Sequence, residues 1–104
     1  MQKFANRAQG AKITLSMDMV NLVPAGQVII GGEVTIALYE GSEASDPNPA
    51  AVLINDPQVE GTKILQMVGG GVVKATYVLS FKATYQDETY DIEQATQTIG
   101  KYVP

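Results

Sequence analysis

The sequence contains no cysteine, no histidine and no tryptophan. Without cysteine there can be no disulfide, thiolate nucleophile or zinc–sulfur site. Without histidine, Ser-His-Asp and Cys-His catalytic arrangements and imidazole metal sites are excluded as well. The lack of tryptophan removes a flat ring suited to stacking on sugars. Together these absences exclude most common hydrolase designs and disfavour a carbohydrate-binding site.

Long apolar runs are also lacking. No stretch approaches the roughly 18 apolar residues that cross a bilayer, and the first residues contain no apolar segment typical of a secretory signal. The 104 residues are 45% hydrophobic and 17% charged, which is typical of one folded domain rather than of a disordered chain. We therefore expect a soluble protein that does not bind membranes.

Positive charge is scarce outside the N-terminus. Lys3, Arg7 and Lys12 are three of the seven basic residues, and residues 1–12 contain no acidic residue. The other four basic residues are scattered among all eleven acidic ones, so the rest of the chain is acidic. Binding to nucleic acid requires a dense basic face, so no direct contact with nucleic acid is expected.

What the sequence does contain is alternation of apolar and polar residues. Residues 1–11 show no period and are predicted to form an N-terminal arm, followed by a single domain over 12–104. Period-two alternation predicts a first strand over 12–20 and a second over 33–38. The Gly31-Gly32 pair before the second strand indicates a bulge, bend or tight turn.

The middle of the sequence predicts a loop and two short strands. The segment 41–49 is polar and holds two prolines, so it is predicted to be an exposed loop. A short strand is expected over 50–54, ended by Asn55-Asp56-Pro57. Another is expected over 62–68, ended by three glycines that lack the helix and the Lys-Ser/Thr of a phosphate-binding loop.

The clearest strand covers 75–85, where Ala75, Tyr77, Leu79, Phe81, Ala83 and Tyr85 share one face. A hairpin connection at 86–88 leads into a last strand over 89–99. Its alternation changes phase after Ile92, so a bulge near Gln94 is predicted to return Ala95 and Ile99 to the core face that Tyr90 and Ile92 share. Tyr39 and Tyr102 are then the tyrosines left to make contacts.

A carboxylate cluster at Asp87, Glu88, Asp91 and Glu93 is the remaining candidate for chemistry. Two carboxylates can hydrolyse a glycoside, and several can hold calcium. Asp91 and Glu93 are predicted on the outward strand face, where nothing would tune their pKa, and no calcium-binding loop pattern is present. The cluster is interpreted as a solvated edge, so we expect no enzyme, no metal and no cofactor.

About seven short strands separated by turns predict an all-β, antiparallel β-sandwich or small barrel. The stretch Ala75-Thr76-Tyr77-Val78-Leu79 resembles the tyrosine corner of immunoglobulin-like domains, with Leu79 in the place of their cysteine. The last third, from Ile64 to Ile99, resembles small immunoglobulin-like β-sandwich proteins of tailed-bacteriophage structural modules. These share the order strand, Gly-Gly turn, Thr-Tyr, alternating strand and polar final hairpin.

The resemblance implies a virion structural protein, most simply a capsid decoration or cement protein that binds neighbouring capsid subunits, with a homo-oligomer as a further option. A neck or tail component, or an immunoglobulin-like adhesion or carbohydrate-binding module, stays open as an alternative. The expected partners are phage capsid or neck and tail proteins. The candidate contact residues are Lys3, Phe4, Arg7, Lys12, Tyr39 and Tyr102.

Overall fold

Strands dominate the computed structural model, which describes residues 1–100. In this range the chain forms eight strands, one 3₁₀-helix (Pro49–Val52) and no α-helix, which confirms the all-β prediction. The strands are β1 (Gln2–Lys3), β2 (Arg7–Ala8), β3 (Ile13–Asp18), β4 (Ile29–Leu38), β5 (Leu53–Glu60), β6 (Lys63–Val68), β7 (Thr76–Tyr85) and β8 (Tyr90–Gly100).

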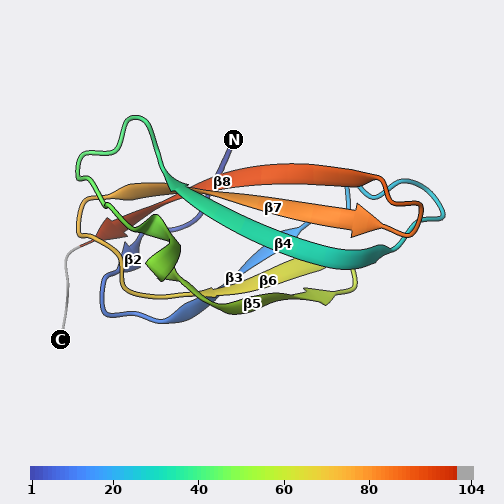
Figure 1. The fold of residues 1–104 in the computed structure, drawn as a ribbon, viewed down its shortest axis with the longest axis horizontal. Helices are drawn as coiled ribbons and strands as arrows, with labels where there is room; N and C mark the ends of the chain where they lie inside the picture. Colours follow the sequence, from blue (N-terminus) through green and yellow to red (C-terminus); the bar gives the residue numbers. More distant parts are fainter. Residues whose placement is uncertain (101–104) are drawn as a thin grey trace.

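The strands form two sheets that lie one over the other (Figure 1). The larger sheet has the order β1-β8-β7-β4, and β2 also pairs with β8. The smaller sheet has the order β3-β6-β5. Side chains from the inner face of each sheet meet in one core, so neither sheet exposes both of its faces to solvent.

Strand β7 supplies the centre of the core. Its inward side chains from Tyr77 to Tyr85 are all buried, whereas the residues between them are half-buried on the outer face. It pairs with β4 on one side and β8 on the other. The prediction of a central strand is confirmed, because uninterrupted period-two alternation suits a strand that has one face on the core.

Strand β3 supplies Leu15 and Met17 to the core and ends two residues earlier than predicted. The Asp18 carboxylate accepts hydrogen bonds from the Val20 backbone N–H at 3.0 Å and from the Thr62 hydroxyl at 2.8 Å. A side chain that bonds its own backbone two residues on favours a turn over a continued ladder. The alternation continues as far as Met19, but the strand does not.

The N-terminal segment is part of the larger sheet and not a protruding arm as predicted. Gln2 and Lys3 lie opposite Ala95 and Thr96 of β8, and Arg7 lies opposite Ile99, in both cases in parallel. The Phe4 ring packs edge-on against the Phe81 ring with 5.9 Å between centroids. The buried Arg7 and the partly buried Phe4 attach the segment to the larger sheet. Because β1 and β2 pair with β8 in parallel, the sandwich is not wholly antiparallel.

The region predicted as a short strand over 50–54 is also different. Pro49–Val52 forms the 3₁₀-helix, and β5 runs on through Asn55-Asp56-Pro57 with a register shift between Ile54 and Gln58. The side-chain amide of Gln66, buried on β6, donates to the carbonyls of Ile54 and Asn55, each at 3.2 Å. This amide satisfies backbone groups that the irregular ladder leaves unpaired, so β5 passes through a sequence that normally ends a strand.

Strand β8 pairs with β7 in unbroken register, so the bulge predicted near Gln94 is wrong. Tyr90 and Ile92 therefore lie on the outer face, 55% and 53% exposed, while Ala95 and Ile99 are buried. Asp91 is half-buried on the inner face instead of outward, and its carboxylate accepts a 2.8 Å hydrogen bond from the Tyr85 hydroxyl. In contrast, the register shift between Ile29 and Gly31 agrees with the irregularity predicted at Gly31-Gly32.

Candidate functional site

The residues predicted to contact a partner do not come together. Lys3 lies on β1 and Tyr39 directly follows β4, at opposite edges of the larger sheet. Lys12 precedes β3 in the smaller sheet, and Tyr102 lies outside the described residues. Phe4 is partly buried and packs against the core. Of the described candidates, Lys3, Lys12 and Tyr39 are exposed, but on separate parts of the molecule.

Arg7 is a buried structural residue, only 3% exposed. Its Nε donates to Oε1 of Gln97 at 3.2 Å, and its Nη1 donates to the Ala11 carbonyl at 3.0 Å. Gln97 in turn donates from Nε2 to the Ala5 carbonyl at 3.1 Å. Burial lowers the pKa of the Arg7 guanidinium. The side chain therefore fixes the N-terminal segment on β8 and is not available to a neighbour.

The predicted outer loop at 41–49 is tied to the body through Tyr77. The Tyr77 hydroxyl donates to Oδ2 of Asp46 at 2.6 Å and accepts from the Val72 backbone N–H at 2.9 Å. Burial and the hydrogen bond to Asp46 raise the pKa of Tyr77 to about 12. The Ser42 hydroxyl also accepts from the Thr76 backbone N–H at 2.8 Å. Because Ser42 and Asp46 both bond to the start of β7, the loop is held against the domain and helps to stabilise it.

A different surface stands out at the end of the molecule where the β3–β4, β5–β6 and β7–β8 connections meet, on the right of Figure 1. Among residues 1–100, seven of the ten exposed large apolar side chains belong to this end. We call this surface the apolar end. Its members are Val20, Leu22, Val28, Ile30, Val59, Tyr90 and Ile92.

A groove of about 430 Å³ opens in the apolar end. Val23, Val28 and Val59 line it together with Gln27. Within the described residues, the side-chain oxygen of Gln27 is buried without a hydrogen-bond partner. The volume falls in the range of roughly 300–1,000 Å³ that binding pockets typically occupy. The groove is therefore walled mainly by apolar side chains and is large enough for a ligand side chain.

The outer face of the larger sheet continues the apolar end. Gly31, Thr84 and Tyr90 lie side by side on the adjacent strands β4, β7 and β8, so the exposed Ile30 and Tyr90 flank the end of β7 from its two neighbouring strands. The Lys82 ammonium lies 4.3 Å from the centroid of the Tyr90 ring and 4.0 Å from the Glu33 carboxylate. This cation is engaged on both sides by its own chain.

Acidic groups surround the apolar end. Seven of the eleven carboxylate residues lie there, but only two basic residues, Lys63 and Lys82. The remaining described residues hold four acidic and four basic groups and are balanced. The seven acidic members are Asp18, Glu33, Glu60, Asp87, Glu88, Asp91 and Glu93.

Two of the four carboxylates considered for catalysis or calcium binding, Asp87 and Asp91, have separate local roles. Asp87 accepts from the Thr89 backbone N–H at 3.1 Å in the β7–β8 turn, and its hydrogen bonds to Thr89 lower its pKa. Asp91 accepts a hydrogen bond from the Tyr85 hydroxyl. Burial of Tyr85, together with this hydrogen bond, raises the pKa of Tyr85 to about 12. Among residues 1–100, no group of three or more acidic side chains is arranged to hold a metal ion.

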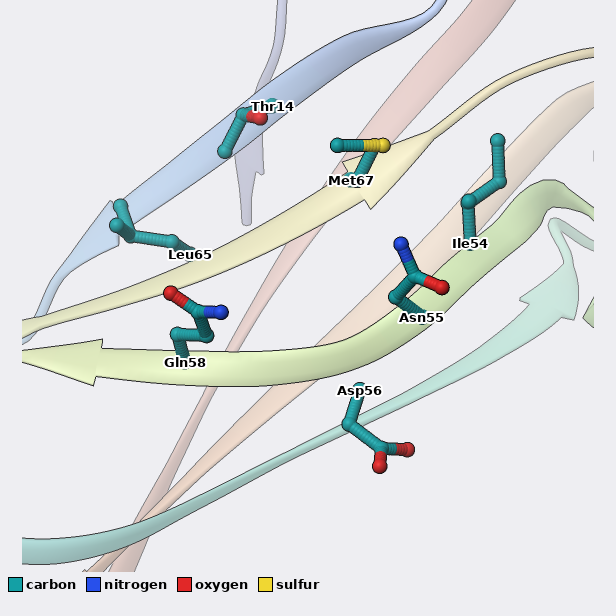
Figure 2. A pocket seen from close by; sticks show the side chains of 7 residues that line it. All are labelled: Thr14, Ile54, Asn55, Asp56, Gln58, Leu65 and Met67. Carbon is teal, nitrogen blue, oxygen red and sulfur yellow. The ribbon is translucent and has the colours of Figure 1, made fainter.

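A second hollow lies on the outer face of the smaller sheet (Figure 2). Leu65 and Met67 of β6 and Thr14 of β3 line it with Gln58 of β5, whereas Asp56 lies on the other side of β5. Its volume of about 190 Å³ is below the usual range for ligand sites. The groove in the apolar end is therefore the stronger candidate.

No protein-family model and no curated protein matches this chain. Among residues 1–100, no helix is long and apolar enough to cross a membrane.

Sequence reasoning did not find the apolar end, although two signals were present. The run Val28-Ile29-Ile30 directly precedes the glycine pair, where a register shift can turn one of its members outward. Tyr90 and Ile92 alternate in the opposite phase to Ala95 and Ile99. Two apolar phases on one strand indicate either a bulge or an exposed apolar face, and here the second explanation holds.

Proposed function

We propose that the protein is a non-enzymatic, immunoglobulin-like binding module that acts as a structural component of a tailed-bacteriophage virion. The strand orders β3-β6-β5 and β4-β7-β8 support the immunoglobulin-like part of this proposal. They correspond to the B-E-D and C-F-G orders of immunoglobulin sandwiches when the strands are taken in chain order. In this correspondence β1 and β2, on β8, take the place of the first strand.

Tyr77 gives the proposed fold a second support. In a tyrosine corner, a tyrosine near the start of the sixth strand bonds through its hydroxyl to the backbone a few residues upstream. The Tyr77 hydroxyl accepts from the N–H of Val72, five residues before it, and Leu79 is buried two residues after it. A hydrogen bond of this kind is specific to the connection between the fifth and sixth strands of such sandwiches.

The binding role is carried by one observation, the gathering of exposed apolar side chains at the apolar end. Single exposed apolar residues are normal on protein surfaces, but contiguous patches rimmed by polar groups mark interaction sites. Large apolar and aromatic side chains at the centre of a contact contribute most of its binding energy. The apolar end is therefore the proposed contact surface for a neighbouring protein.

The virion role rests on the resemblance of the last third to phage structural proteins. A rigid sandwich with one contact surface suits attachment to a repeated shell, since repetition multiplies modest contacts into tight association. A capsid decoration or cement protein, bound to capsid subunits, is the proposed position. A neck or tail position would use the same surface at a lower copy number.

The test uses phage particles assembled with variant proteins. Val28→Ser with Ile92→Ser removes two exposed members of the apolar end, and Tyr39→Ser is the matched control at a distant exposed site. We expect mass spectrometry of purified virions to detect the native and control proteins and to find the apolar-end variant depleted. A copy number equal to that of the capsid subunit supports decoration, and a much lower number supports the neck or tail.

Two results would contradict the proposal. One is the absence of the native protein from purified virions. The other is saturable binding of the isolated protein to glycans that remains unchanged in the apolar-end variant, since this would favour an adhesion module that uses other loops.

A further inference from the structure

The charge at the apolar end restricts the chemistry of its partner. Five of its seven carboxylate residues are exposed, whereas Asp91 and Glu93 are half-buried at inward positions of β8, and the basic residues there are Lys63 and Lys82. The exposed five are Asp18, Glu33, Glu60, Asp87 and Glu88. Lys82 is already engaged by Glu33 and by the Tyr90 ring. An apolar partner without positive charge would remove water from these carboxylates with no compensation, which is unfavourable. A partner with cationic side chains at the rim would pair with them instead.

The groove adds a requirement for apolar side chains. Val23, Val28 and Val59 line it, and Val28 and Val59 are 53% and 37% exposed. An apolar side chain that enters between these walls leaves water and gains free energy in proportion to the apolar area that it buries.

We propose that the apolar end binds an extended segment of a different protein in which apolar side chains alternate with arginine or lysine. The apolar side chains enter the groove between Val28 and Val59, and the cationic ones pair with the carboxylates at the rim. This inference rests on the proposed binding function and names the chemistry of the partner.

A second copy of this chain does not provide that chemistry. Outside the apolar end, the described residues include four basic groups and as many acidic ones. Arg7 is buried, and Lys74 lies 4.0 Å from the Glu43 carboxylate. Among residues 1–100, the exposed lysines outside the apolar end are Lys3 on β1, Lys12 directly before β3 and Lys74 between β6 and β7. Within the described part of the chain, a second copy therefore presents no concentrated basic face that could match the acidic rim.

The test titrates the full-length, isotope-labelled protein with a synthetic peptide of alternating arginine and valine, followed by NMR chemical shifts. We expect saturable shifts confined to residues 20–30, 59–63 and 82–92, and weaker binding as salt concentration rises. A peptide of alternating glutamate and valine is the matched control and should give no saturable shift. The combined variant Glu60→Lys and Asp87→Lys should lose about tenfold in affinity.

Glu40→Lys with Glu43→Lys makes the same change in net charge away from the apolar end and should keep the native affinity. Equal weakening in this control, shifts spread over both sheets, or binding of the glutamate peptide would overturn the proposal. So would concentration-dependent shifts at the apolar end without peptide, since a second copy would then occupy it. Because the titration needs no virion, its failure alongside normal incorporation would reject only the partner chemistry.

Discussion

The Tyr77 hydroxyl donates a 2.6 Å hydrogen bond to Asp46, thirty-one residues earlier in the chain. The same oxygen accepts from the Val72 N–H at 2.9 Å, so one phenol connects the loop after β4, the turn before β7 and the core. Because each of these groups bonds to the same atom, removing that atom should loosen the loop and the turn together.

Tyr77→Phe should lower the free energy of unfolding by about 1–3 kcal/mol, because the Val72 N–H loses its acceptor while the ring stays in place. Urea denaturation followed by circular dichroism measures this difference. Hydrogen exchange at Val72 should also become faster in the variant. An unchanged exchange rate would mean that the Tyr77 hydroxyl does not hold this turn.

Stability should fall at alkaline pH because of two tyrosines. The pKa values of Tyr77 and Tyr85 are raised from 10.0 to about 12 in the folded state. The unfolded chain therefore loses these protons first, so their contribution is fully present below about pH 10 and is lost as the pH rises towards 12. Urea denaturation between about pH 9 and pH 12 should show this decline.

The double variant Tyr77→Phe with Tyr85→Phe is the control for the alkaline experiment. Lysine titration is common to both proteins, so the native protein should show the steeper loss of stability with pH. Identical slopes for the two proteins would contradict the role of these phenols.

Arg7 and Gln97 should act as one unit in stability. Arg7→Met leaves the Gln97 side-chain oxygen without its 3.2 Å donor, and Gln97→Leu leaves Arg7 Nε without its acceptor. The double variant removes the donor and the acceptor together and leaves neither group unpaired. The losses of unfolding free energy in the two single variants should therefore be non-additive by about 0.5–3 kcal/mol in a double-mutant cycle measured by urea denaturation. Additive effects would show that the pair is not energetically coupled.

Gln66→Leu should destabilise the protein by about 1–3 kcal/mol, although it places an apolar residue in the core. The buried amide donates to three carbonyls, those of Ile54, Asn55 and Met67. Gln58→Leu makes the same substitution at an exposed position of β5 and should change stability by no more than about 0.5 kcal/mol. Equal effects in thermal or urea unfolding would reject the role assigned to the amide.

Ile92→Ala and Ile99→Ala test the register of β8 directly. Ile92 is 53% exposed, so its truncation should cost at most about 0.5 kcal/mol. Ile99 is 1% exposed, and its truncation should cost about 2–5 kcal/mol. If a bulge placed both residues in the core, the two losses measured by urea denaturation would be similar.

The sequence predicted β7 well because a single phase of alternation runs through it from end to end. It did not predict which side chains of β8 point to the core. Tyr90 and Ile99 belong to opposite phases of the alternation, and a period of two alone does not say which phase is buried. The hydrogen bond between Tyr85 and Asp91 accommodates a carboxylate on the inner face. Such a pairing depends on contacts across strands, which no local pattern contains.

The N-terminal segment could not be predicted for a different reason. Strands β1 and β2 have two residues each, too few to show a period. Their positions depend on β8 and on the bond between Arg7 and Gln97, ninety residues apart. The apolar end was missed as a consequence of the β8 error, because an apolar residue assigned to the core is not considered as a contact.

The parallel pairing of residues 2–3 and 7–8 with β8 also affects how the protein is made. Residues 2–8 are synthesised before β8, so they must wait for that strand before they can join the larger sheet. Until then Phe4 and the inner face of β7 stay uncovered, and contacts so distant in sequence form slowly. Chains that stop before β8 should therefore depend on chaperones far more than chains that include it.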